Sequence, residues 1–265
     1  MKQHLKSFLQ VRKATSFGAR LSQQLNHEGE KLPRTFTLVV WNIFKRHGGE
    51  IFDKDICDLA YRSDILCLQE VLANQKLDLP HELWELNHNY SISYHRPDGF
   101  TEGVLTASGY PIHKQAHALL SLRREPVTKT PKATVISLLP MTTGQNLLVI
   151  NLHMLLFKRR SVFRLELEQV LSTVKTYSHL PAVFCGDFNT FTRNQLRLLD
   201  EILGEAGFER CKPFHMPRTR RYLDHIYIRG LHLLEMEIID TISSSDHSPL
   251  ICKVELASGI RHRPD

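Results

Sequence analysis

The sequence lacks the features that would mark a membrane-spanning, secreted or repetitive protein. No apolar run approaches the ~18 residues of a membrane span, and the N-terminus has no ~7-residue apolar signal core. There is no internal repeat or low-complexity segment. The five cysteines are odd in number and form no C-x-x-C pair, which favours a reducing compartment. We therefore expect a soluble, cytoplasmic protein, and no feature calls for an obligate protein partner.

The central part of the chain also lacks net charge. The whole chain has a formal net charge of +6. Residues 1–33 contain six basic and two acidic residues, whereas residues 34–255 contain 26 basic and 25 acidic residues. A near-neutral body gives no global evidence for a nucleic-acid partner. We expect a basic N-terminal arm over 1–33, helical in part or disordered, one domain over 34–256, and a tail over 257–265.

The chain does contain apolar, strand-like runs that end in polar residues. They cover 38–42, 65–70, 147–153 and 182–189, and a final pair of motifs lies at 222–224 and 245–247. Buried strands are continuous apolar stretches, so each polar group is expected at a strand end. Cys67, Cys185 and Cys252 lie inside such runs and are expected in the core.

Helical spacing separates the later runs. Apolar residues recur every three or four positions over 163–174 and again over 196–203, where Gly207 is expected to end the helix. Short strands joined by turns are expected at 103–108, 110–112 and 133–139. Strands that alternate with helices predict a layered α/β (α+β) domain with helices packed outside the sheets.

The polar strand ends supply two kinds of chemistry. Glu70, Asp187 and Asp246 would repel one another unless a cation held them, and an oxygen-rich set of ligands favours Mg²⁺ or Mn²⁺ over zinc. His153 and His247 can exchange protons near neutral pH, and Asp224 is the natural partner to orient His247. A structural role as a loop cap is the alternative for any one of these acids.

Together these motifs resemble the endonuclease/exonuclease/phosphatase superfamily, also called DNase I-like, and within it an uncharacterised bacterial subfamily. The motifs that carry the resemblance are Trp41-Asn42, Gln69-Glu70, Asn151-Leu-His153, Gly186-Asp-Phe-Asn189, Leu223-Asp224 and Ser245-Asp-His247-Ser-Pro. The resemblance implies a four-layer fold, in which two mixed β-sheets pack face to face with helices outside. It also implies a metal-dependent hydrolase that attacks phosphate esters with water.

The resemblance further implies a role for each motif. Asn42, Glu70 and Asp246 would hold the metal. Asp187 and Asn189 would position the attacking water and contact the phosphate. His247, oriented by Asp224, would act as base or as stabiliser of the transition state, and His153 would assist the leaving oxygen.

The substrate is less well defined. Val71-Leu72 after Glu70 departs from abasic-site endonucleases, and 218–222 lacks the signature of inositol polyphosphate 5-phosphatases. Basic clusters near the motifs favour a polyanion such as DNA or RNA, although a solvated surface is equally compatible with them. We expect phosphate contacts from Arg159, Arg160, Arg220 and Arg221. The leading prediction is a nuclease; the alternatives are a phosphatase or sphingomyelinase-like phosphodiesterase, or an inactive binding module.

Overall fold

A computed structural model gives the fold of the chain over residues 29–113, 117–156, 159–213 and 223–258, together with the strand backbone at 16–17 and 20–23. In these parts of the chain the strands form two sheets, one of nine strands and one of six. Both sheets are mixed, because one pair in each is parallel, β3 with β4 and β10 with β11. No helix in the described residues is long and apolar enough to cross a membrane.

The first sheet has the strand order β1-β6-β7-β4-β3-β15-β14, with β2 beside β6 and β5 beside β4. Its strands are β1 (Ser16–Phe17), β2 (Arg20–Gln23), β3 (Thr35–Asn42), β4 (Ile65–Asn74), β5 (Lys76–Leu77), β6 (Asn87–His95), β7 (Thr101–Ser108), β14 (Leu231–Ile238) and β15 (Leu250–Leu256). The expected N-terminal arm lies mostly outside the described residues, but β1 and β2 join the sheet through β6.

The second sheet has the order β12-β13-β11-β10-β9-β8. Its strands are β8 (His117–Leu120), β9 (Ala133–Pro140), β10 (Asn146–His153), β11 (Ala182–Asp187), β12 (Glu209–Arg210) and β13 (Asp224–Arg229). The predicted strands at 103–108 and 133–139 are confirmed as β7 and β9. The one predicted at 110–112 is wrong: this segment is a loop, since Pro111 cannot donate to a strand ladder.

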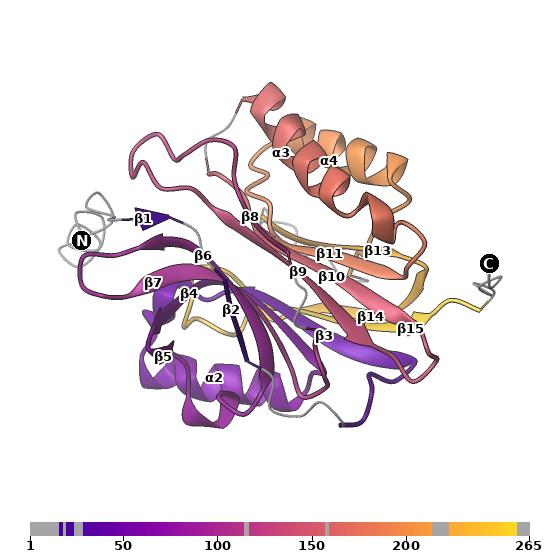
Figure 1. Ribbon diagram of the computed structural model, residues 1–265, viewed down its shortest axis with the longest axis horizontal. Helices are drawn as coiled ribbons and strands as arrows, with labels where there is room; N and C mark the ends of the chain where they lie inside the picture. The colour runs from indigo at the N-terminus through magenta and orange to yellow at the C-terminus, as the bar shows by residue number, and fades with distance from the viewer. Residues whose placement is uncertain are drawn as a thin grey trace.

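Helices cover the outer face of each sheet, which gives the expected four layers (Figure 1). α2 (Glu50–Tyr61) packs Phe52, Ile56 and Leu59 on the first sheet. α3 (Arg160–Thr173) and α4 (Arg193–Glu205) pack on the second. The two predicted helices are confirmed, and Gly207, with a left-handed φ of 80°, follows the end of α4. Single 3₁₀ turns lie at Phe44–Arg46, His81–Leu83 and Lys175–Tyr177.

The main core lies between the sheets. Alternate residues of a strand point to opposite faces, so Val40 and Cys67 of the first sheet meet Val149 and Cys185 of the second. Cys252 is buried in the same cluster, which confirms the core positions expected for these three cysteines. Burial of these apolar faces brings the ends of β3, β10 and β11 and the middle of β4 together along one rim.

Candidate active site

Three of the predicted polar residues end their strands, as expected, and one does not. Asn42 ends β3, His153 ends β10 and Asp187 ends β11. β4 instead continues past Glu70 to Asn74. A bulge shifts the register against β7 between Leu68 and Val71, and Glu70 within it has a left-handed φ of 57°. The bulge redirects the chain at Glu70 without ending the strand.

Gly186 sets the position of Asp187. A Cβ at this residue would lie 2.0 Å from the carbonyl oxygen of Leu152, and its φ is +130°. Only glycine permits this close approach of β11 to β10 and this backbone conformation. The approach places Asp187 beside His153 in register, with Asp224 opposite it on β13.

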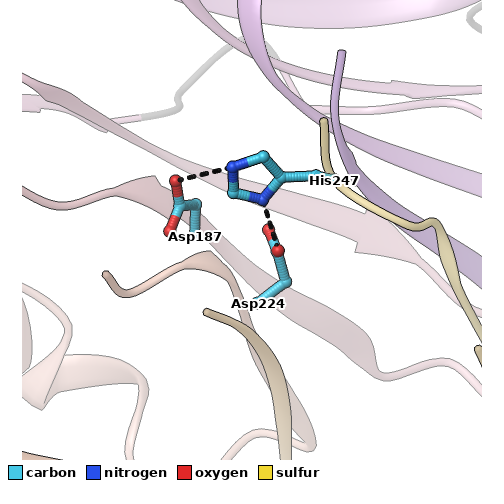
Figure 2. Close-up of side chains that lie close together, drawn as sticks. All are labelled: Asp187, Asp224 and His247. Atoms are coloured by element: carbon cyan, nitrogen blue, oxygen red, sulfur yellow. Dashed lines mark hydrogen bonds and ion pairs between the residues drawn. The ribbon is translucent and has the colours of Figure 1, made fainter. Parts of the chain in front are cut away.

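Asp187, Asp224 and His247 form the centre of the site (Figure 2). Nδ1 of His247 lies 2.6 Å from Oδ2 of Asp224, and its Nε2 lies 4.0 Å from Oδ2 of Asp187. The loop that carries His247 is fixed to β3, because Trp41 Nε1 donates to the His247 carbonyl over 2.8 Å. The predicted pairing of Asp224 with His247 is therefore present.

These contacts set the charge of each group. Burial opposes charge on His247, but the Asp224 carboxylate outweighs it and raises the pKa of His247 to about 10. Burial, followed by repulsion from Asp224, raises the pKa of Asp187 to about 7. At neutral pH, His247 is therefore an imidazolium, whereas Asp187 exchanges a proton readily.

His153 reaches Asp187 from the other side. Its Nε2 lies 3.3 Å from Asp187 Oδ2, and its Nδ1 lies 3.5 Å from Lys132 Nζ. Because an ammonium only donates, Nδ1 accepts and Nε2 carries the proton that faces Asp187. Burial and then the Lys132 charge hold the pKa of His153 well below its usual value, so the ring is neutral.

Two asparagines hold the Asp187 carboxylate. Asn42 Nδ2 donates to Oδ2 over 3.1 Å, and the backbone N–H of Asn189 donates to Oδ1 over 2.9 Å. Asn189 also donates from Nδ2 to the carbonyl of Met154 and has a left-handed φ of 51°. Asn42 thus joins the two sheets at the rim, and its strand register places it beside Gln69 and next to Glu70.

Glu70 is held by two lysines. Lys45 Nζ contacts its Oε2, and Lys132 Nζ lies 3.7 Å from its Oε1. Burial opposes the negative charge, but Lys45 and Lys132 outweigh it and hold the pKa of Glu70 well below its usual range. Lys45 also lies 3.6 Å from Oε2 of Glu102, a buried acid on β7.

The structure does not draw the remaining predicted residues into this network. Asp246 is exposed beside His247, and Arg159 and Arg160 are exposed at the start of α3, six and seven residues after His153. Arg220 and Arg221 lie outside the described residues.

Sequence reasoning assigned no role to Lys45, Glu102 or Lys132. Lys45 follows Asn42 by three positions, and Glu102 precedes the glycine opposite the Glu70 bulge. The short distance along the chain from Asn42 to Lys45 was the only signal in the sequence, because neither Lys45 nor Glu102 ends an apolar run.

The carboxylate oxygens at the rim fit a hard divalent cation. Asp187 and Asp224 each place an oxygen within 4.8 Å of a His247 ring nitrogen and of one another, but both nitrogens of an imidazolium carry protons and cannot be ligands. Oδ1 of Asp224 is buried and has no hydrogen-bond partner within the described parts of the chain. Buried carboxylate oxygens without a partner are costly unless a cation or water satisfies them, and Mg²⁺ prefers such oxygens.

This arrangement has counterparts in known proteins. A model of the Endonuclease/Exonuclease/phosphatase family matches residues 39–247, which is most of the chain. The chain belongs to this family. A UPF0294 protein of Yersinia pseudotuberculosis is 26% identical over 239 residues, which cover 86% of this chain and 87% of that protein. The expected resemblance to an uncharacterised bacterial subfamily is thus confirmed.

Solved structures share the fold at low identity. The human Nocturnin catalytic domain with bound sulfate has a TM-score of 0.63 and 19% identity, over 90% of this chain and 97% of that one. The endonuclease/exonuclease/phosphatase from Bacteroides vulgatus has a TM-score of 0.65 and 17% identity, over 84% and 99%. At this identity the likeness shows the fold alone. Family membership and the acid, amide and histidine set together support a phosphoesterase.

Proposed function

We propose that the protein is a divalent-metal-dependent phosphodiesterase, and specifically a nuclease that cleaves DNA or RNA by in-line attack of water. The observation that carries this proposal is the Asp187 carboxylate, which lies between a neutral histidine and a charged one. His153 approaches it at 3.3 Å and His247 at 4.0 Å, and Asp224 fixes His247 from behind. The proposed base, Asp187, therefore has a proton donor, His153, on one side and a cationic stabiliser, His247, on the other.

Asp187 is the proposed base for the attacking water. Its pKa of about 7 suits proton transfer near neutral pH. The N–H groups of Asn42 and Asn189 fix both of its oxygens, which leaves the carboxylate little freedom to rotate. Asn189 is the proposed second contact to water and phosphate.

His247 is the proposed stabiliser of the phosphoryl oxygens. A group with a pKa of about 10 already holds its proton at neutral pH and cannot accept another. This favours stabilisation over general-base action, the two roles that the sequence left open. Fixed cations that face developing negative charge are among the largest catalytic contributions.

His153 is proposed to assist the leaving oxygen. Its ring is neutral and its Nε2 carries a proton. An N–H of this kind can donate a hydrogen bond to the leaving oxygen once substrate displaces the contact with Asp187.

Glu70, Asn42 and Asp246 are the proposed residues that hold Mg²⁺ or Mn²⁺. Such an ion supplies a Lewis acid that neutralises charge on the phosphoryl oxygens. Glu70 is partly buried and ionised, Asn42 lies beside it, and Asp246 is exposed next to His247.

Exposed arginines on two neighbouring loops support a nucleic-acid substrate. The backbone N–H of Leu156 donates to Glu125 over 2.6 Å and joins the loop after His153 to the loop that leads to Lys132. The first loop leads to Arg159 and Arg160 and the second carries Arg123 and Arg124, all of them exposed. Cations beside the cleavage site can bind flanking phosphates.

The same loops support one alternative, a phospholipid substrate. Leu122, Val127 and Leu156 are large apolar residues that are 52%, 44% and 37% exposed. Apolar side chains among arginines suit a surface that meets lipid head groups.

A substrate panel tests the proposal. Purified protein with 5′-labelled single-stranded DNA, duplex DNA, RNA, sphingomyelin vesicles and a small phosphomonoester is assayed with added Mn²⁺ and with a chelator instead. We expect metal-dependent cleavage of at least one nucleic acid, and none by Asp187→Asn. Hydrolysis of sphingomyelin alone would replace the nuclease assignment, and no hydrolysis of any substrate would favour a binding module.

We also propose that the protein works in the cytoplasm. All five cysteines are free, and four of them are buried. Free thiols are typical of a reducing compartment.

A further inference from the structure

A cation already lies between two carboxylates at the rim, and it belongs to the protein itself. The Lys45 ammonium contacts Oε2 of Glu70 and lies 3.6 Å from Oε2 of Glu102. The side chains of the three residues are only 14%, 13% and 4% exposed. A lysine this buried pays a desolvation cost that its two acids must offset.

The backbone holds Lys45 in this position. Phe44, Lys45 and Arg46 all have left-handed φ angles, 47°, 55° and 57°, which non-glycine residues adopt only where surrounding contacts enforce them. Arg46 supplies such contacts, since its guanidinium donates to Asp53 over 2.8 Å and to Asp78 over 2.7 Å. The ammonium is thus directed into the site by a clamped turn.

Glu102 is also held in a fixed position, as Lys45 is. Tyr94 Oη donates to its Oε2, and the residue lies on β7 opposite Leu72 of β4. The next residue, Gly103, has no room for a side chain, because a Cβ there would lie 2.2 Å from the carbonyl oxygen of Ser91. β6, β7 and the Glu70 bulge are therefore pressed together around this carboxylate.

Charge balance decides what happens when a divalent ion arrives. Lys45 and Lys132 carry two positive charges against the two negative charges of Glu70 and Glu102, so the cluster is neutral without a metal. A divalent ion that binds Glu70 would leave two uncompensated positive charges in a poorly solvated site, and withdrawal of one ammonium would remove one of them. Lys45 is the ammonium that touches both acids, since it contacts Oε2 of Glu70 and lies 3.6 Å from Oε2 of Glu102.

We propose that Glu102 is a further carboxylate of the metal site and that Lys45 competes with the divalent ion for the Glu70–Glu102 pair. The proposal rests on the metal dependence of the proposed function and adds two residues to it. Lys45 acts as a positioning residue that keeps both carboxylates in place until the ion displaces its ammonium.

Calorimetric titration of the metal-free protein with Mn²⁺, without substrate, tests the competition. Lys45→Met removes the competitor and is expected to tighten the Kd by about tenfold or more. Lys132→Met, which removes contacts to Glu70 and His153 but none to Glu102, is expected to tighten it less. Glu102→Gln is expected to weaken it by about tenfold. Lys76→Met serves as the matched control and should leave the Kd unchanged. Lys76 lies on β5, and its ammonium packs over the Trp84 ring.

Circular dichroism and thermal unfolding of each variant accompany the titration. An unchanged or weaker Kd for a folded Lys45→Met, or an unchanged Kd for Glu102→Gln, would overturn the inference. If Lys45→Met does not fold without metal, the Glu102→Gln titration alone decides. Mn²⁺ binding that shifts as expected in a protein that cleaves no substrate would refute the proposed function and leave this inference standing.

Discussion

The two halves of the site solve the problem of buried charge differently. On the second sheet, Asp187 and Asp224 share two imidazoles, and one oxygen of Asp224 stays without a partner in the described structure. On the first sheet, Glu70 and Glu102 each face the Lys45 ammonium. The residues on the second sheet provide groups that exchange protons. Those on the first sheet provide carboxylates with a fixed charge. We infer that the second-sheet half performs acid–base chemistry and the first-sheet half handles cations.

The backbone differs between the halves in the same way. Asp187 and His153 end adjacent parallel strands, so the sheet alone brings them together. Glu70 and Lys45 meet through a bulge and a left-handed turn, two local departures from regular structure. Such departures cost conformational free energy, and they persist at sites where the contacts that they create are used.

The largest expected effect comes from the loss of one key residue in each half. Glu70→Ala and His247→Ala should each lower kcat by roughly 10³-fold or more, because residues that act as one catalytic unit fail together. The double variant should be little worse than either single one. Steady-state hydrolysis of the best substrate from the panel measures this.

Glu235→Ala and His232→Ala are the matched controls, since both residues are exposed on β14 at the far edge of the first sheet. Their rates should equal that of the unmodified protein. Fully additive losses in the double variant would show that the two halves work independently.

Asp224→Asn tests the acid–base half without substrate. The pKa of His247 rises from 6.5 to about 10 in the folded protein. A group with a raised pKa stabilises the fold below its unfolded pKa, and this stabilisation disappears as the pH rises through the folded value. Between about pH 6.5 and about pH 10 the metal-free protein should therefore lose free energy of unfolding, and Asp224→Asn should lose less.

Urea unfolding at several pH values in a chelating buffer measures both curves. Above about pH 7 their difference reports His247, because Asp187, whose pKa of about 7 Asp224 also raises, has then lost its proton. Parallel curves across this range would mean that Asp224 does not hold the imidazolium, and the role of His247 as a cationic stabiliser would fall with it.

The sequence predicted the second-sheet half far better than the first. His153 and Asp187 follow long apolar runs, and strand ends in a layered α/β fold meet along one rim. Glu102 and Lys45 follow no such run, and their meeting depends on strand register and on a left-handed turn. Neither leaves a periodic signal, so only the three-dimensional structure reveals the lysine pairing.

The fold shows the same limit. β3, β10 and β11 have apolar sequences and were predicted, whereas β6 has the sequence NHNYSISYH and was not. Its polar residues are buried because partners satisfy them: Asn89 Nδ2 donates to Ser137 of the other sheet over 3.0 Å. Burial of polar side chains through specific contacts cannot be inferred from hydrophobic pattern alone.

The smallest expected effect concerns substrate binding by the exposed arginines at the start of α3. Arg159→Ala combined with Arg160→Ala should raise KM for a nucleic acid and leave kcat unchanged, because exposed arginines contact phosphates away from the reacting bond. Each lost phosphate contact should reduce the slope of log affinity against log salt by about 0.7 to 0.9. Measurements of KM from low to high salt give this slope.

Lys54→Ala on α2 controls for net charge, since α2 covers the opposite outer face from α3 (Figure 1). Its slope should match that of the unmodified protein, because a long-range effect of charge alone is screened within about 10 Å at 0.1 M salt. If the double variant and Lys54→Ala weaken binding equally, the arginines make no local phosphate contact. The exposed leucines of the same loops would then favour a lipid surface as the substrate.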